Sequence, residues 1–468
     1  MAAPDTSVPP LARAVRPASR PGVRAWVVTG MLVVFMMINF ADKAVFGLAA
    51  DEIRSDLGLS ATDFGLANSA FFLLFSVAAA GVGLLADRLP LRWLLLAMAL
   101  MWSVAQVPAA LGGGLAVLIG TRVVLGAAEG PAFPVAQQAA LSWFPNDRRN
   151  LPGALVTLGV TLGVVTAAPG LSWVIQNHGW RAALWVVAAL GLVWSAGWLV
   201  CGADGPYRDG IEARTRGTRT RDAGPSPVSS ASRAWPAYRR VFASRTWIGT
   251  TAAYFTSYWG VALMLVWLPS YLKNGLGHSP EAAGRLVALP WALGAVVLLG
   301  QAALTGWLMR RGVGSRWARG RVGAALLLVG ALAFLAVPLA EGTGAKTALL
   351  VVGFGFGGSF ATVAVTTVAE LAPASRRGGA LGTMNAVVTT AGLIAPTVVG
   401  RMVDAQGPAG YQTAILVSAV LLLVGAACAF VLVDPARDAA RVGADTEADA
   451  DADADTDAPA TATATADA

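Results

Sequence analysis

Two adjacent ionisable residues, Asp42 and Lys43, interrupt a long apolar stretch of the sequence. They stand in the segment INFADKAVFG, which runs from Ile38 to Gly47 and lies near the end of an apolar run that begins around Trp26. An ionisable side chain deep in a bilayer costs at least about 2.5 to 3.5 kcal/mol on insertion scales. A chain that keeps an acid and a base side by side there must gain something from them, and such groups can bind a proton and an anion.

A second acid and base, Arg122 and Glu129, lie in the apolar run over residues 114–141. Their spacing places them on nearly the same face of a helix, about 10.5 Å apart along its axis. At that separation the two side chains cannot pair directly. Each therefore needs a partner from elsewhere in the fold.

The composition indicates what kind of protein holds these residues. The chain has 468 residues, of which 56% are hydrophobic and 13% charged, and its mean hydropathy is +0.62. It is too apolar for a soluble globular domain, so we expect a membrane protein. The net charge of +7 does not indicate nucleic acid binding, because the arginines cluster in short loops. Neither the 2 cysteines nor the 2 histidines form a ligand set, so we expect no metal and no cofactor.

Breaks at Gly, Pro and charged clusters divide the chain into twelve apolar runs. A bilayer core about 30 Å thick needs about 20 apolar residues per helix, and each run is close to that length. The sequence therefore predicts an all-α membrane protein with twelve transmembrane helices. The runs cover residues 26–49, 64–86, 92–110, 114–141, 152–176, 180–202, 245–273, 283–309, 320–340, 346–371, 378–404 and 411–433.

The basic residues of the loops predict the orientation. They fill alternate connections, whereas the first intervening loop, DEIRSDLGLSATD, is acidic. By the positive-inside rule, both termini lie in the cytoplasm of a cell whose inner membrane holds the protein as a multi-pass chain. The basic positions are Arg13, Arg16, Arg20 and Arg24 before the first run, then Arg88 with Arg92, Arg148 with Arg149, Arg310 with Arg311, and Arg376 with Arg377.

The runs form two halves that resemble each other. GLLADR at residues 83–88 is echoed by GWLMRR at 306–311, and RRNLPGALVTLGVTLG is echoed by RRGGALGTMNAVVTTAG. Two such halves place a substrate site at mid-membrane between them. We expect a cytoplasmic N-terminal tail (1–25), an N-terminal six-helix half (26–202), a cytoplasmic central loop (203–244), a C-terminal six-helix half (245–434) and a disordered acidic tail (435–468).

Several motifs resemble those of the major facilitator superfamily. GLLADRLPLR is similar to its signature loop, and NFADKAVFGLA, RVVLGAAEGPAFP, HGWR, WLPSYL and APASRRGGALGTMNAVVTTAGLIAP resemble the anion:cation symporter group. That group includes transporters for D-galactonate, hexuronates, tartrate and phthalate. The group usually has Arg where Lys43 stands, Tyr near Phe75 and Gly at Pro90. The resemblance covers nearly the whole chain and implies the major facilitator fold.

The resemblance also implies how the four buried charges meet, because this fold packs the first span against the fourth. Asp42, Lys43, Arg122 and Glu129 sum to zero when all are ionised, which makes an empty site tolerable. An arriving carboxylate would take Lys43 or Arg122 as its counter-ion, and protonation of Asp42 or Glu129 would restore neutrality. A purely structural role, in which buried ion pairs fix the helix register, is the alternative.

Other residues are assigned to substrate or gating mainly through the resemblance. It places the seventh span, with Tyr258 and Trp259, beside the cavity, although lipid-facing or core aromatics are the alternative. Ser359 and Asn385 match polar substrate contacts of the group, and a lone Asn can instead bond a neighbouring helix. The predicted substrate-binding residues are Lys43, Arg122, Phe75, Tyr258, Trp259, Ser359 and Asn385, and the predicted gating residues at the cytoplasmic mouth are Asp87, Arg88 and Arg92.

These features together predict a secondary active transporter and not an enzyme, since no nucleophile with a base is visible. We expect proton-coupled uptake of a small organic anion, such as a sugar acid or another carboxylate, by a monomer that works by alternating access. One alternative is a proton-driven exporter of hydrophobic or aromatic compounds. Another is a membrane sensor that does not transport.

Overall fold

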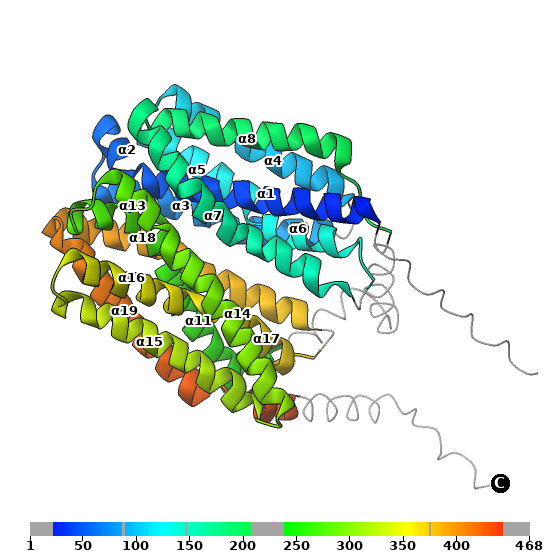
Figure 1. Ribbon diagram of the computed structural model, residues 1–468. Coiled ribbons are helices and arrows are strands. Elements are labelled where there is room, and N and C mark those ends of the chain that lie inside the picture. Colours follow the sequence, from blue (N-terminus) through cyan, green and yellow to red (C-terminus); the bar gives the residue numbers. More distant parts are fainter. Residues whose placement is uncertain (1–21, 87–88, 146–147, 207–237, 374–375, 443–468) are drawn as a thin grey trace, which may run out of the picture.

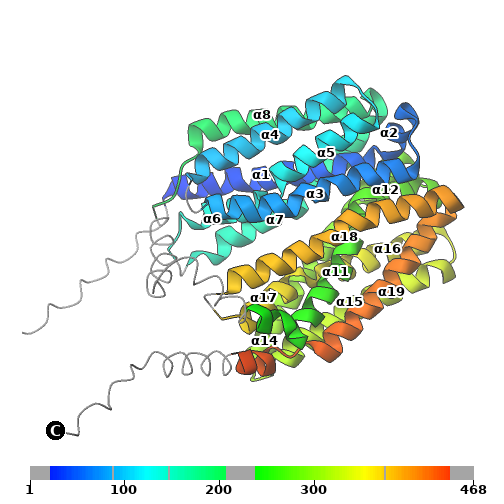
Figure 2. The ribbon, with the colours of Figure 1, turned by 180° about the vertical axis from the view of Figure 1, so that it is seen from behind.

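The protein is built from helices, as a computed structural model describes it over residues 22–86, 89–145, 148–206, 238–373 and 376–442, and these residues hold no strand. Figures 1 and 2 show the helices as two groups that lie side by side. The N-terminal half contains α1 (Val23–Leu48), α2 (Ala50–Leu57), α3 (Ala61–Ala86), α4 (Leu91–Leu111), α5 (Leu115–Glu129), α6 (Ala132–Leu141), α7 (Asn150–His178) and α8 (Trp180–Cys201).

The C-terminal half repeats this plan with more interruptions. Several of its spans contain short π or 3-10 segments, which are labelled η. Its elements are α11 (Arg245–Val266), α12 (Leu268–Ser270), η2 (Tyr271–Gly275), α13 (Pro280–Leu286), α14 (Ala288–Arg310), η3 (Arg316–Arg321), α15 (Val322–Ala336), η4 (Val337–Leu339), α16 (Thr343–Gly357), η5 (Gly358–Phe360), α17 (Ala361–Leu371), α18 (Arg377–Gln406) and α19 (Ala409–Leu432).

The predicted twelve spans are confirmed. In the described part of the chain, eleven helices are long and apolar enough to cross a membrane, and one bent pair makes the twelfth span. That pair joins α11 to residues 268–275 at an angle of 59°. The bend falls at Trp267, two residues before Pro269, and a proline removes a backbone donor and clashes with the preceding helical turn.

The two halves contact each other mainly through α3 with α18 and α7 with α14. Glycines permit the close approach of α3 and α18, because a side chain at Gly65 would meet the backbone of Pro396 and one at Gly392 would meet the ring of Phe72. Ser69 and Thr397 share a hydrogen bond of 2.8 Å across the same contact. Small residues along both helices therefore bring the halves together.

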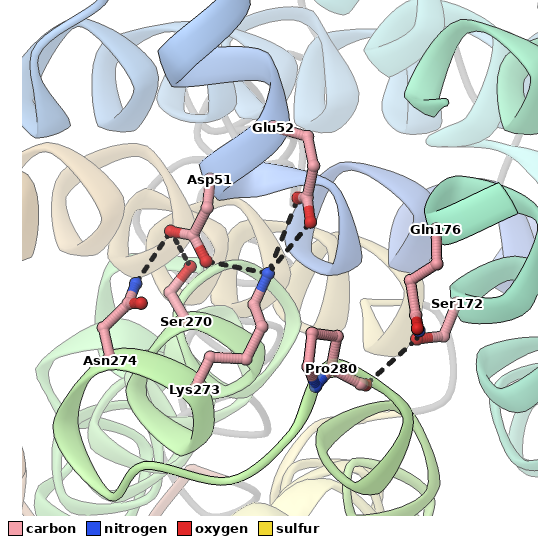
Figure 3. A network of polar contacts seen from close by, with 8 residues as sticks. All are labelled: Asp51, Glu52, Ser172, Gln176, Ser270, Lys273, Asn274 and Pro280. Atoms are coloured by element: carbon pink, nitrogen blue, oxygen red, sulfur yellow. Dashed lines mark hydrogen bonds and ion pairs between the residues drawn. The ribbon is translucent and has the colours of Figure 1, made fainter. Parts of the chain in front are cut away.

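One end of the bundle, which holds α2 and α13, joins the halves through charged contacts, and we call it the α2 end. Figure 3 shows Lys273 of η2 between Asp51 and Glu52 of α2, with 2.7 Å from its Nζ to an Asp51 oxygen. Asn274 Nδ2 donates to Asp51 over 2.9 Å. At the opposite end, which holds α6 and α17, the ribbons of the two halves stand apart (Figure 1).

The C-terminal half ends later than predicted, so the expected boundary of the acidic tail at residue 435 is wrong. Residues 435–442 form a short helix against the bundle, and Asp438 is only 4% exposed. Its carboxylate accepts a hydrogen bond of 2.9 Å from the backbone N–H of Thr246. That N–H lies in the first turn of α11, where backbone donors have no partner within the helix. The predicted termini and most of the central loop lie outside the described residues.

Candidate functional site

A cavity of about 350 Å³ lies between the two halves. Its wall is formed in the N-terminal half by α1, α3, α5, α6 and α7, and in the C-terminal half by α11, α14, α16, η5 and α17. A volume of this size falls in the usual range for small-molecule sites, about 300 to 1,000 Å³. The cavity therefore lies where two repeated halves are expected to hold a substrate.

An ion pair between α1 and α5 stands on the cavity wall. Lys43 Nζ donates to Glu129 Oε2, and it also donates to Asn39 Oδ1 over 2.6 Å. The ammonium lies 4.7 Å from the centre of the Phe40 ring, a cation–π distance. The side chains of Lys43 and Glu129 are 9% and 1% exposed. The expectation that Glu129 finds its partner on the first span is confirmed by this pair.

Asp42 points away from the cavity toward α4. Successive residues of a helix are turned by about 100°, so Asp42 and Lys43 serve different neighbours. Asp42 is fully buried and accepts a hydrogen bond from Gln106 Nε2, and it interacts electrostatically with Glu129 and Arg122. Its Oδ2 has no hydrogen-bond partner among the described residues. An acid oxygen is thus left open directly behind the cavity wall.

Arg122 is a buried cation that belongs to the cavity wall and has two donor nitrogens without a partner among the described residues. Its Nη2 donates to Asn68 Oδ1 over 2.7 Å, and its guanidinium carbon lies 3.8 Å from the centre of the Phe46 ring and 5.2 Å from that of Phe71. The residue is 4% exposed, and its Nε and Nη1 have no hydrogen-bond partner in the described chain. A guanidinium held this way can donate to an anion that enters the cavity.

The structure brings some predicted substrate residues to the cavity and leaves others away from it. Phe75, Tyr258 and Ser359 line the cavity with Lys43 and Arg122. Trp259 does not, because the residue after Tyr258 is turned into the core of the C-terminal half, where it is 6% exposed. Asn385, on α18, is also absent from the lining.

The predicted gating residues are described only in part. Asp87 and Arg88 lie outside the described residues. Arg92 Nη2 donates to the carbonyl of Leu199 at the end of α8 over 2.6 Å, and its backbone N–H donates to Asp204. These contacts stay within the N-terminal half.

Sequence reasoning missed several residues of the site. Asn39 precedes Lys43 by one helical turn, so the spacing could have revealed it. Asn68 and Gln106 come from other helices, and nothing in their own neighbourhood marks them. Phe354 of α16 and Trp291 of α14 also line the cavity. Because both lie in apolar runs, the sequence alone does not distinguish them from ordinary core residues.

The two walls of the cavity differ in charge. The N-terminal half contributes Lys43, Arg122 and Glu129, whereas the described lining residues of the C-terminal half include no Asp, Glu, Lys, Arg or His. The C-terminal wall is instead aromatic and aliphatic. No group of three His, Cys, Asp or Glu side chains that could hold a metal ion occurs among the residues that the structure describes.

Comparison with known proteins gives the family. The model of the Major Facilitator Superfamily matches residues 32–368 and 348–462. The chain belongs to this superfamily. It is therefore a membrane transporter and not an enzyme.

Curated relatives match over most of their length. The chain is 29% identical to a probable sulfoacetate transporter of Cupriavidus necator, covering 86% of this chain and 92% of that protein. It is 28% identical to a D-galactonate transporter of Escherichia coli O6:H1, covering 91% and 99%. Among solved structures, a bacterial homologue of the human lysosomal transporter Spinster, inward-facing and unoccupied, matches with a TM-score of 0.72 at 19% identity, covering 91% of this chain and 99% of that one.

Proposed function

We propose that this protein imports a small organic anion together with protons by alternating access. The observation that carries the proposal is Arg122, a residue that lines the cavity between the halves and whose buried guanidinium has two donor nitrogens left unpaired by the described chain. The curated relatives support the substrate class, since their names include sulfoacetate and D-galactonate transporters.

The anion would bind at the wall of the N-terminal half. Lys43 is already paired with Glu129, so Arg122 offers the vacant donors. A carboxylate could accept from both, because planar guanidinium and carboxylate groups match in geometry. Lys43 would add attraction as a nearby point charge.

The proton would bind at Asp42 or Glu129. The four buried charges sum to zero, so a bound anion leaves the site with an excess negative charge in a medium of low dielectric constant. Asp42 Oδ2 and Glu129 Oε1 both lack a hydrogen-bond partner among the described residues, which leaves each able to take a proton. Carrying an uncompensated anion into a negative interior costs about 2.3 kcal/mol per 100 mV, and one proton removes that cost.

The halves would then rock about the cavity. With both termini in the cytoplasm, the α2 end faces outward, and the ion pairs of Lys273 with Asp51 and Glu52 close it. Release of these pairs would open the cavity to the outside. In this proposal Asp87, Arg88 and Arg92 act at the cytoplasmic mouth.

The proposal can be tested in liposomes that hold a pH dye. Addition of sugar acids, hydroxy acids, aromatic acids and dicarboxylates in turn should acidify the interior with at least one compound, and the double variant Asp42→Asn, Glu129→Gln should abolish that signal. Asp56→Asn is the matched control, because Asp56 pairs with Arg181 on the surface with 43% exposure. Proton influx that persists when both Asp42 and Glu129 are neutralised would contradict the coupling assignment.

The aromatic C-terminal wall favours a second candidate, an exporter of hydrophobic or aromatic compounds. An exporter of this kind would give no role to the two nitrogens of Arg122 that have no hydrogen-bond partner in the described chain. Cells that lack the protein would become sensitive to such compounds if the exporter function were correct, and would lose growth on the carboxylate if the import function were correct.

A further inference from the structure

One wall of the cavity carries charged side chains and the other is aromatic and aliphatic, and this difference limits the class of substrate that fits. We infer that the substrate carries a single carboxylate on a flat aromatic body, with the carboxylate at Arg122 and the body against the rings of the C-terminal half. The inference rests on the proposed function and specifies the ligand of the same site. It excludes dicarboxylates and polyhydroxylated acids as preferred substrates.

The number of unpaired basic side chains in the cavity limits the number of anionic groups that the substrate can carry. Among the described lining residues the only basic side chains are Lys43 and Arg122, and Lys43 is paired with Glu129. A second carboxylate on the substrate would lie near Glu129 or against the neutral wall of the C-terminal half. Neither place offers a counter-ion, and a buried charge without a partner is strongly disfavoured. One anionic group therefore suits the site.

Aromatic rings from both halves surround the remaining space. The Phe72 and Tyr258 rings meet edge to face with centroids 6.1 Å apart, and Phe40 meets Trp291 in the same way at 5.8 Å. Tyr254 and Tyr258 are also edge to face, at 6.3 Å. Rings in such arrangements present faces and edges on which a further aromatic ring can pack.

The C-terminal wall offers few partners to a polyhydroxylated body. Its polar lining side chains in the described chain are Tyr254, Tyr258, Trp291 and Ser359, and the Ser359 hydroxyl already donates to the Phe356 carbonyl over 2.7 Å. Every hydroxyl of a sugar acid brings a donor and acceptors that need partners once they leave water. An aromatic body needs none.

The test compares ligands on purified wild-type protein by calorimetry at one pH. The probes are benzoate, phenylacetate and 3-phenylpropionate, then cyclohexanecarboxylate, isophthalate, D-galactonate and the neutral 3-phenylpropionamide. We expect the best aromatic monocarboxylate to bind at least about tenfold more tightly than D-galactonate, with cyclohexanecarboxylate between them and no binding of the amide.

Substitutions at Trp291 distinguish the loss of ring stacking with the substrate from a general loss of protein stability. Trp291→Leu should weaken the best aromatic acid about tenfold while its effect on cyclohexanecarboxylate is smaller, and Trp291→Phe should restore most of the loss. Trp185→Leu is the matched control, because Trp185 is 44% exposed and does not line the cavity. If Trp291→Leu fails to fold, Tyr258→Leu and its conservative counterpart Tyr258→Phe take its place.

The outcomes distinguish this inference from the proposed function. Tighter binding of D-galactonate or isophthalate than of every aromatic monocarboxylate, lost in Arg122→Gln, would overturn the inference and leave organic anion transport standing. Equal binding of 3-phenylpropionamide and 3-phenylpropionate, or no binding of any carboxylate, would overturn the proposed function and the inference with it.

Discussion

The two halves share one plan of six spans, yet their contributions to the cavity differ. The N-terminal half supplies an ion pair between Lys43 and Glu129, and a partly unpaired Arg122. The C-terminal half supplies rings such as Tyr258 and Trp291, with no acidic or basic side chain among its described lining residues. Repetition of the fold has therefore not been accompanied by repetition of the chemistry.

This difference suggests a division of labour. Groups that exchange protons and hold an anion must sit close enough to influence one another in a medium of low dielectric constant, and α1, α4 and α5 achieve this within a single half. The residues of the C-terminal half that contact the rest of the substrate can then change without altering the coupling between the anion and the proton. Substitutions on the two walls should accordingly affect different measurements.

The largest effect is expected from Arg122→Gln. Truncating one partner of a buried, hydrogen-bonded charge pair costs about 2 to 5 kcal/mol, so carboxylate affinity should fall by about 30-fold or more. Calorimetry on the purified variant measures it. Arg181→Gln, which breaks an exposed ion pair in the same half, is the control. Unchanged affinity would show that the anion binds elsewhere.

Neutralising both acids should uncouple transport. In the double variant Asp42→Asn, Glu129→Gln, an inward pH gradient of one unit should no longer drive accumulation, which in the wild type reaches about tenfold per proton. Exchange of labelled for unlabelled substrate should persist, because exchange needs no net proton movement. Loss of both activities in a folded variant would point to binding instead of coupling, and each single variant identifies the acid responsible.

The C-terminal wall should affect affinity alone. Trp291→Leu removes one ring from a site lined by several, and an aromatic pair contributes about 0.5 to 1.5 kcal/mol beyond its buried area. The ratio of protons to substrate, measured from the parallel fluxes of protons and labelled substrate into liposomes, should equal that of the wild type. A changed ratio would break the proposed division between the halves.

The smallest effect is expected at the α2 end, away from both walls. Lys273→Gln removes the cation between Asp51 and Glu52, whose ion pairs are partly exposed and contribute about 1 kcal/mol at most. Spin labels on α2 and α13 should report a severalfold larger population with these helices apart, while affinity for the carboxylate changes little. A population equal to that of the wild type would mean that other contacts, such as the hydrogen bond from Asn274 to Asp51 and the packing of α3 against α18, keep this end closed.

The sequence predicted the spans well because apolar length and breaks are local signals. It also predicted that Glu129 needs a partner from another helix, since seven residues separate it from Arg122 along one helix, and the resemblance to the superfamily implied that this partner lies on the first span. It could not identify Asn68 or Gln106, whose roles depend on how α3 and α4 pack against α5 and α1. It missed the helix over residues 435–442 because the contact that holds Asp438 joins it to Thr246, a distant part of the chain.

The central claim is that an anion and a proton bind to the same half in one linked step. Proton uptake on binding tests it most directly: the tightest-binding carboxylate of the panel is added to purified protein in a weakly buffered solution at pH 7, and the released or absorbed protons are titrated. The account predicts uptake of about one proton per bound carboxylate, lost in the double variant Asp42→Asn, Glu129→Gln. Binding without proton uptake, or uptake that the double variant retains, would contradict it.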